Sequence, residues 1–268
     1  MTSSKPVSPS ENVHVVEPTT LLIERGSDRV HVQLNRPDVR NAIDQTMIDE
    51  LHAVCEQLER EPLILIISGS NGVFASGADI AQLRERRRED ALKGINSGLF
   101  SRIARLPMPV IAALDGWALG GGAELAYAAD FRIASTTVRL GNPETALGIL
   151  PAAGALWRLA QLVGEPVAKE IILAGRVLTA DEALAVHLIT EIHASEDLVA
   201  AAHALADRIG AQDPLATRLA KEVFHAAAEA HPRVDNEAQA ILFESPEKFA
   251  RMDEFLAKRK RPRATARP

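Results

Sequence analysis

Cysteine is almost absent from this sequence, because Cys55 is the only one in 268 residues. A single cysteine cannot form an intramolecular disulfide or build a cysteine-based zinc site. The eight histidines are scattered, with no pair four residues apart in any segment that looks like a site. We therefore expect no metal centre, and we expect Cys55 to be a small buried residue on a helix, as unpaired cysteines commonly are.

Aromatic residues are also scarce, at 4% of the chain, so alanine, leucine, isoleucine and valine must fill the core. Long apolar runs are missing too. The longest candidates, Leu63–Ile67 and Val110–Leu114, fall far short of the roughly 18 residues that a membrane-spanning helix needs. Residues 1–17 lack the apolar stretch of a secretory signal and the arginines of a transit peptide. We expect a disordered segment over 1–17 and a cytoplasmic protein that does not bind membranes.

Positive charge is in the minority, since the formal net charge is -6 at pH 7. This balance argues against an affinity of the whole protein for nucleic acid or anionic membranes. Two basic patches are exceptions to the acidic net charge: Arg84 with Arg86–Arg88, and a tail from Lys258 to Arg263 and Arg267. Each patch could be a solvated surface, which is the common case, or a contact for phosphate groups, which guanidinium groups bind well.

Strand-like and helical patterns alternate along residues 18–196. Apolar runs at Leu21–Glu24 and Val30–Asn35 flank Gly26-Ser27-Asp28, which predicts a hairpin. Apolar residues at helical spacing from Met47 to Leu58 follow Asp44, a candidate N-cap. Further strands are predicted at Leu63–Ile67, Val110–Leu114, Phe131–Ala134 and Leu188–His193. The alternation indicates an α/β fold.

From Asp197 onward the pattern is helical. Ala-rich stretches continue to Ala230, and a further helix is predicted over Pro246–Lys258. We therefore divide the chain into the segment 1–17, a core over 18–196 that holds the site, and a helical region with a basic tail over 197–268.

Three loops after predicted strands combine glycine with acidic residues, and such loops are where α/β enzymes usually place their sites. In the first, Phe74–Ile80, Gly77 permits an unusual backbone angle and Asp79 can cap the helix that follows. Amides near Ala78 could then point outward to receive an anion. A plain junction between loop and helix would have the same composition, so this segment alone does not indicate a site.

The second segment, Asp115–Leu125, contains the triple glycine Gly120–Gly122. Such a run stabilises neither strand nor helix, which indicates that the backbone approaches a ligand there, with exposed amides at a helix start. Glu124 lies in the first helical turn, where it could simply be a favourable charge. In the third segment, Gly141–Pro151, Glu144 again lies near a helix start. Two carboxylates beside glycine-containing backbone fit general acid–base chemistry.

At these residues the sequence resembles the crotonase, or enoyl-CoA hydratase/isomerase, superfamily, from roughly residue 20 to residue 258. The motifs that carry the resemblance are Leu34–Pro37 with Arg40–Ala42, Ser76–Ile80, Pro109–Ala113 through Gly120–Leu125, and Gly141–Glu144. The resemblance implies a spiral of β-β-α turns and a helical C-terminal region that packs in trimers, or in hexamers as dimers of trimers.

The resemblance also implies an activity. The expected enzyme is an enoyl-CoA hydratase of fatty acid metabolism, a carbon–oxygen lyase that adds water reversibly across the 2,3 double bond of a 2-enoyl-CoA thioester. Coenzyme A is then part of the acyl-CoA substrate, and no separate cofactor is expected.

Transferred position by position, the resemblance makes Glu124 and Glu144 the catalytic carboxylates and the amides of Ala78 and Gly121 the oxyanion hole. We expect Glu144 to be the main proton donor to C2 and Glu124 to position and activate water, although coupled acids can exchange these duties. Further substrate contacts are expected from Arg40, Ala75, Gly77, Asp79, Ile80, Gly120 and Ala152.

The chain departs from the family pattern after Pro151, where hydratases usually continue with a glycine-rich run and Thr-Gln-Arg. Here the residues are Ala152-Ala153-Gly154-Ala155-Leu156-Trp157-Arg158. An amide at Ala152 could bind the water only if this position needs no positive φ. Leu156 and Trp157 leave the preferred acyl chain open.

Two other activities fit the same resemblance. An enoyl-CoA isomerase, or a dehydratase, would share the fold, but isomerisation needs only one carboxylate, so the presence of both glutamates favours hydration. Some relatives bind RNA, for which the arginine patch could serve. The acidic net charge argues against RNA binding here.

Overall fold

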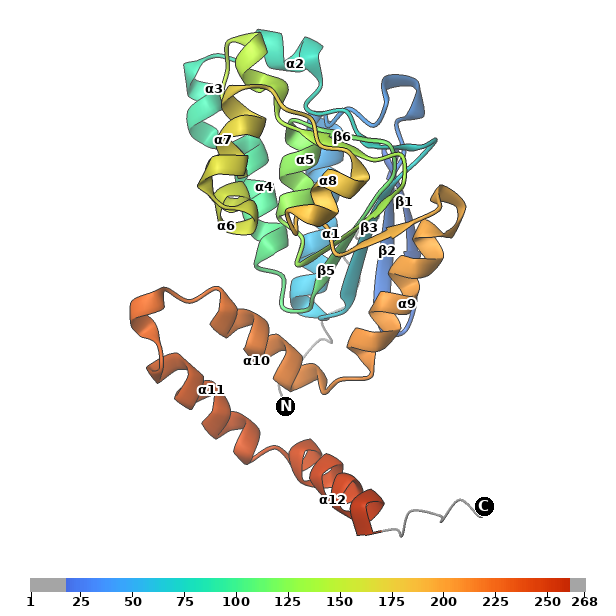
Figure 1. Ribbon diagram of the computed structural model, residues 1–268, viewed down its shortest axis with the longest axis vertical. Coiled ribbons are helices and arrows are strands. Elements are labelled where there is room, and N and C mark those ends of the chain that lie inside the picture. Colours follow the sequence, from blue (N-terminus) through green and yellow to red (C-terminus); the bar gives the residue numbers. More distant parts are fainter. Residues whose placement is uncertain (1–17, 261–268) are drawn as a thin grey trace, which may run out of the picture.

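The computed structural model describes residues 18–260, in which two β-sheets lie among helices (Figure 1). The expected disorder of 1–17 and the end of the basic tail, 261–268, fall outside the described residues. No helix in the described part of the chain combines the length and the apolar character that crossing a membrane requires.

The strands are β1 (Leu21–Arg25), β2 (Arg29–Leu34), β3 (Ile64–Gly69), β4 (Val73–Ala75), β5 (Val110–Leu114), β6 (Trp117–Leu119), β7 (Phe131–Ser135), β8 (Arg139–Gly141) and β9 (Glu191–His193). The helices of the core are α1 (Gln45–Arg60), α2 (Ile80–Glu85), α3 (Arg88–Lys93), α4 (Ile95–Ala104), α5 (Gly121–Tyr127), α6 (Ala160–Val163), α7 (Glu165–Leu173) and α8 (Ala180–Ala185). The C-terminal helices are α9 (Leu198–Gly210), α10 (Pro214–Phe224), α11 (Arg233–Phe243) and α12 (Pro246–Lys260).

From β3 to β9, successive strands alternate between the two sheets. The larger sheet has the order β1-β2-β3-β5-β7-β9, and the smaller sheet has the order β4-β6-β8. All neighbouring strands are parallel except in the β1–β2 hairpin, which forms where the sequence predicts it. After the β1–β2 hairpin, the next turns place one strand in each sheet before a helix follows, as in β5-β6-α5. This arrangement is the expected spiral of β-β-α turns, and the α/β class is confirmed.

The continuous apolar runs form inner strands of the larger sheet. In β5, Val110, Ala112 and Leu114 face the main core, whereas Ile111 and Ala113 face α9 on the opposite side. None of these five residues is more than 1% exposed. A parallel inner strand is covered on both faces, so it needs no polar alternation.

Helix α1 begins where the sequence predicts it. The Asp44 carboxylate accepts a hydrogen bond of 2.8 Å from the amide of Met47, which satisfies one of the free donors at the helix start. Cys55 lies on the buried face of this helix and is 1% exposed, as expected. Burial raises the pKa of its thiol to about 12. Cys55 is therefore an unreactive core residue at neutral pH.

Some elements differ from the sequence-based prediction. The strands of the smaller sheet were not predicted, because three residues each are too few to display an apolar period. Helix α11 was not predicted either, since it follows the Ala-rich stretch that ends at Ala230. The strand predicted over Leu188–His193 is shorter, because Leu188 and Ile189 are buried in the preceding turn and only β9 pairs with β7.

The helices α10, α11 and α12 extend away from the two sheets as an arm (Figure 1). The arm is attached through Lys221 of α10, whose Nζ donates to Asp130 at 2.6 Å and to the carbonyl of Met108 at 3.0 Å. Lys221 is only 8% exposed, so this ion pair is buried. Removing one partner of such a pair leaves an uncompensated charge and is strongly destabilising.

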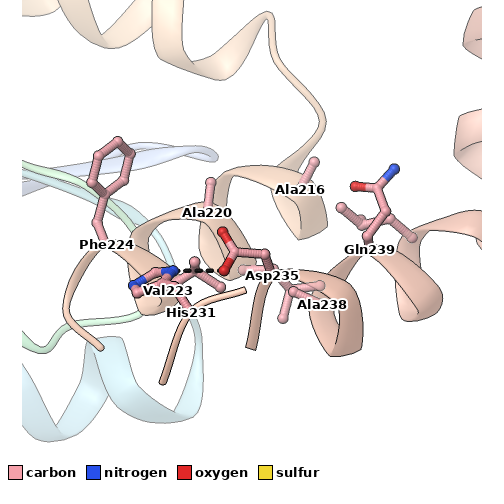
Figure 2. A pocket seen from close by; sticks show the side chains of 10 residues that line it. Ala216, Ala220, Val223, Phe224, His231, Asp235, Ala238 and Gln239 are labelled. Carbon is pink, nitrogen blue, oxygen red and sulfur yellow. Dashed lines mark hydrogen bonds and ion pairs between the residues drawn. The ribbon is translucent and has the colours of Figure 1, made fainter. Parts of the chain in front are cut away.

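Within the arm, α10 and α11 pack around a mainly apolar cavity of about 350 Å³. Figure 2 shows the side chains that line it, with His231 directed toward Asp235 at one wall, where nitrogen and oxygen are 2.6 Å apart. None of the lining residues belongs to the three segments that the sequence singles out. The cavity is thus a feature of the arm and not of the candidate site.

Candidate active site

The first glycine loop is held in place by Ile43, two residues before the start of α1. The amide of Ile43 donates to the Gly77 carbonyl at 2.8 Å, and the amide of Asp79 donates to the Ile43 carbonyl at 2.9 Å. These two bonds fix the residues on either side of Ala78 and leave the Ala78 amide without an acceptor in the described part of the chain. Gly77 has a φ of +119°, which favours glycine and explains its place in the motif.

The second glycine loop brings the start of α5 to the same point. Gly120 has a φ of +51° and its amide donates to the Gly141 carbonyl at 2.9 Å. Gly121 is the first residue of α5, so its amide has no partner within the helix. A Cβ atom placed on Gly121 would lie 3.3 Å from the amide nitrogen of Ala78. Two N–H donors from separate loops, neither with an acceptor among the described residues, therefore converge, as an oxyanion hole requires.

Gly122 is expected to tolerate no side chain. A Cβ atom there would lie 2.3 Å from the carbonyl oxygen of Ala75, a backbone atom of β4. Gly98, in the middle of α4, offers a matched control, because nothing lies within 4 Å of a Cβ atom at that position.

We expect Gly122→Ala to lower the free energy of unfolding by about 2 kcal/mol. Gly98→Ala should instead raise it by about 1 kcal/mol through better helix propensity. Urea unfolding followed by circular dichroism measures both changes. If the two variants had the same stability, the close approach of α5 to β4 would be refuted.

Glu124 is held inside the protein by backbone amides. It lies in the first turn of α5, is 3% exposed, and its Oε1 accepts hydrogen bonds from the amides of Ala153 at 2.7 Å and Ala155 at 3.1 Å. Both bonds end on Oε1, which leaves Oε2 for a water or a substrate atom. Burial, opposed by these amides and reinforced by the charge of Glu144, raises the pKa of Glu124 to about 7.

Glu144 lies in the 3₁₀ helix Pro143–Leu147 and is 8% exposed. The side chain of Asn142 donates to its Oε1 at 3.4 Å, and Tyr127 donates to Asn142 at 3.0 Å. The other oxygen, Oε2, is buried and has no hydrogen-bond partner within residues 18–260. A Cβ atom on Gly120 would lie 3.1 Å from Glu144 Oε1, which places this carboxyl beside the start of α5. Burial raises the pKa of Glu144 as well.

The two carboxyl groups thus form an interacting pair. The negative charge of Glu144 is one of the causes that raise the pKa of Glu124, so the two groups are close enough to influence each other's ionisation. Both pKa values are raised, which favours a state in which the pair holds one proton near neutral pH. Such a pair can accept a proton at one carboxyl and donate one from the other.

We expect Glu124→Gln to stabilise the protein more at pH 8 than at pH 5. A carboxyl whose pKa is raised on folding contributes stability that is complete below its ordinary pKa and is lost as the pH rises through the folded value, here about 7. Glutamine carries no charge to bury at any pH and keeps an oxygen for both amides. The advantage of the variant should therefore grow by about 2 kcal/mol between the two pH values. Chemical unfolding at each pH measures it, and a pH-independent difference would contradict the raised pKa.

The remaining residues expected to contact the substrate differ in exposure and in their structural roles. Ala75 is fully buried at the end of β4, and Ile80 is 59% exposed at the start of α2. Asp79 is occupied structurally, because it caps α2 through the amides of Ala81 and Gln82.

Two further residues expected to contact the substrate, Arg40 and Ala152, are exposed. Arg40 adjoins the first loop, since its carbonyl accepts a hydrogen bond of 3.0 Å from the Ser76 amide. Ala152 has no positive φ, so the condition on that position is met. Gly154 takes the unusual angle instead, with a φ of +152°. The contact of Ala152 with water and that of Arg40 with substrate stay predictions.

The sequence did not identify the groups that hold the two glutamates. The amides of Ala153 and Ala155, which bind Glu124, come from the segment that departs from the family pattern. Asn142 lies within the motif Gly141–Glu144 and Tyr127 lies two residues after Leu125, but the sequence assigned neither a role in supporting Glu144. In the stretch that binds Glu124, the one residue that stands out in the sequence is Gly154, an isolated glycine between alanines.

Comparison with known proteins identifies the family and supports the fold. The family model described as enoyl-CoA hydratase/isomerase matches residues 25–263. The chain is 33% identical to a short-chain-enoyl-CoA hydratase of Clostridium acetobutylicum, over 91% of this chain and 97% of that protein. It is 32% identical to a crotonyl-CoA hydratase of Syntrophomonas wolfei, over 90% and 96% of the two chains. The crystal structure of an enoyl-CoA hydratase from Bacillus anthracis superimposes with a TM-score of 0.84 at 30% identity, over 89% and 96% of the two chains.

Proposed function

The chain belongs to the enoyl-CoA hydratase/isomerase family, and on that premise we propose that it catalyses the reversible addition of water to the 2,3 double bond of a 2-enoyl-CoA thioester. The observation that carries the proposal is the convergence of two unsatisfied backbone N–H donors with an interacting pair of buried carboxyl groups. Hydration needs both parts, because charge develops on the thioester oxygen while one proton leaves the attacking water and another is added to C2.

The amides of Ala78 and Gly121 bind the thioester oxygen. When water attacks C3, the electron pair of the double bond moves through C2 and the carbonyl carbon onto this oxygen. Fixed N–H donors aimed at an oxygen that becomes negative stabilise the transition state more than the ground state, and one such donor is typically worth about 3 kcal/mol.

The two glutamates bind the water and carry out the two proton transfers. Glu124, anchored by two amides through Oε1, positions the water with Oε2 and accepts its proton. Glu144, whose Oε2 has no hydrogen-bond partner, donates a proton to C2. One carboxyl gains a proton and the other loses one, so the pair keeps its total number of protons during the addition.

Purified protein should bleach the ultraviolet absorbance of crotonyl-CoA, because hydration destroys the conjugation between the double bond and the thioester. Mass spectrometry should find a product heavier by one water. A panel of enoyl-CoA chain lengths would then define the preferred acyl group. Intact absorbance across the whole panel at high enzyme concentration would refute the proposal.

The same panel separates hydration from isomerisation. A 3-enoyl-CoA substrate gains absorbance when its double bond moves into conjugation, without a change in mass. We propose that hydration dominates, since the site holds two carboxyl groups where isomerisation needs one. We also propose that no metal or other cofactor takes part, so a chelator such as EDTA should leave the rate unchanged.

We further propose that the protein assembles as a trimer, or as a hexamer of two trimers, through the arm. Several large apolar side chains of the arm are at least half exposed: Phe224, Ile241, Phe243, Phe249, Met252 and Leu256. Phe224 is the most exposed of these side chains, at 87%. A surface patch of exposed apolar side chains is typical of a protein interface. Light scattering on a sizing column gives the assembly state, and Phe224→Asp should shift it toward the monomer. A monomeric wild-type protein would contradict this proposal.

The binding of the CoA phosphates is assigned to Arg40 and to three arginines of the basic patch, Arg84, Arg87 and Arg88. These guanidinium groups lie beside or after the first loop, and arginine suits phosphate geometry. The expected result of Arg40→Ala is a higher KM for the CoA thioester with little change in kcat. An unchanged KM would remove Arg40 from the phosphate site.

A further inference from the structure

We propose that the side-chain amide of Asn96 is a third hydrogen-bond donor at the oxyanion site, and that Arg86 is the residue that orients it. This inference rests on the proposed function, because it concerns the same thioester oxygen. It adds a side chain from α4 to a site otherwise built from the backbone of two glycine loops.

The position of Asn96 follows from the geometry around Gly121. A Cβ atom on Gly121 would lie 3.3 Å from the Ala78 amide nitrogen and 3.7 Å from Asn96 Nδ2. The same small region is therefore bordered by both backbone donors and by the Asn96 side chain. Asn96 is half-buried in the first turn of α4, so it faces the site from a rigid element and not from a loop.

The orientation of the Asn96 amide is fixed by Arg86. The Nη1 atom of Arg86 donates a hydrogen bond of 3.0 Å to the Asn96 side-chain oxygen, Oδ1. A guanidinium group has no acceptor, so the atom it contacts must be the oxygen of the amide and not its nitrogen. The NH₂ group must then be the part directed toward Gly121. Within residues 18–260 this NH₂ group has no hydrogen-bond acceptor, although it has two N–H donors to offer.

The chemical role follows from the free donor. Near Ala78 and Gly121 the group that needs donors is the thioester oxygen as it becomes enolate-like. A neutral NH₂ group there strengthens the polarisation of the carbonyl without adding a charge that would hold the product. Arg86 does not touch the substrate in this arrangement. It is a positioning residue, which keeps the amide from rotating and presenting its oxygen to the developing negative charge.

Asn96→Asp is the most direct test. Aspartate has the shape of asparagine and can keep the contact with Arg86, but it offers a charged acceptor where the NH₂ donor was. We expect kcat on crotonyl-CoA to fall by at least about 100-fold, and Asn96→Leu, which removes the donor without adding a charge, to lower it by about 10-fold. Ser97→Ala is the control on the same helix, because in the described part of the chain the Ser97 hydroxyl bonds to the Gly94 carbonyl and to no other group. The control should keep the wild-type rate.

A second readout follows polarisation of the carbonyl directly. A cinnamoyl-CoA with a para-dialkylamino group absorbs at longer wavelength when donors pull electron density onto its thioester oxygen. The bound spectrum should shift to the red in the wild type and in Ser97→Ala, and less in Asn96→Leu. Equal red shifts in Asn96→Leu and the wild type would overturn the proposal, as would an Asn96→Asp variant with the wild-type kcat.

Arg86 is tested by a double-mutant cycle. Arg86→Met should lower kcat, and the loss should vanish in the Asn96→Leu background, because Arg86 acts through Asn96. If Arg86→Met instead raised only KM, and did so equally in both backgrounds, Arg86 would be a phosphate contact and not a positioning residue. Failure of the proposed function has a separate signature, namely wild-type protein that hydrates no enoyl-CoA. The bound spectrum still reports on Asn96 in that case, and wild-type protein that binds no acyl-CoA would overturn both proposals.

Discussion

Glu144→Gln is expected to lower kcat for hydration of crotonyl-CoA by at least about 100-fold. Glutamine keeps the size of the side chain and can accept the hydrogen bond from Asn142, but it has no acidic proton to give to C2. The unpartnered Oε2 of Glu144 makes this variant informative, because no other contact of that atom is lost with the proton. Stopped-flow or steady-state absorbance of the enoyl thioester measures the loss.

The control for this variant is Glu196→Gln, an exposed glutamate in the short 3₁₀ helix Ser195–Asp197. It should have the wild-type rate, and KM should change little in either variant, because the thioester is bound mainly by backbone amides and by contacts to CoA. A Glu144→Gln enzyme with the rate of the control would remove Glu144 as the proton donor.

Glu124→Gln is the second variant for which we expect a large loss, of about 100-fold to 1,000-fold in kcat. The amide oxygen can still accept hydrogen bonds from Ala153 and Ala155, so the loop should remain in place while the base is gone. A variant that binds acyl-CoA normally but hydrates it slowly would assign Glu124 to the chemical step. A variant with unimpaired kcat would exclude it.

The pH dependence gives Glu124 its own signature. Because its pKa is raised to about 7 and the base must be ionised to accept a proton from water, kcat/KM of the wild type should fall as the pH drops below about 7. This limb should disappear from the residual activity of Glu124→Gln. Combining the two replacements should cost less than the product of the single losses, since residues that act as a unit are not additive.

The predictions from sequence succeeded where a residue's role depends on its near neighbours along the chain. Asp44 and Asp79 were expected to cap helices, and both accept hydrogen bonds from the amides that follow them. The run Val110–Leu114 was expected to be a buried strand and is β5. These features are local, because capping and apolar periodicity act over a few residues.

The sequence by itself determined the α/β class, the helical C-terminal region, and the segments that carry the candidate site, because glycine, proline and acidic residues leave their signals within short stretches of chain. Only the tertiary structure decided which atoms meet. Ala78 and Gly121 come from different turns of the spiral, and Asn96 comes from α4. Ala153 and Ala155, which bind Glu124, belong to the stretch that follows Pro151. The physical reason is that hydrogen bonds and pKa values depend on distance and burial in space, which the packing of the two sheets and their helices sets.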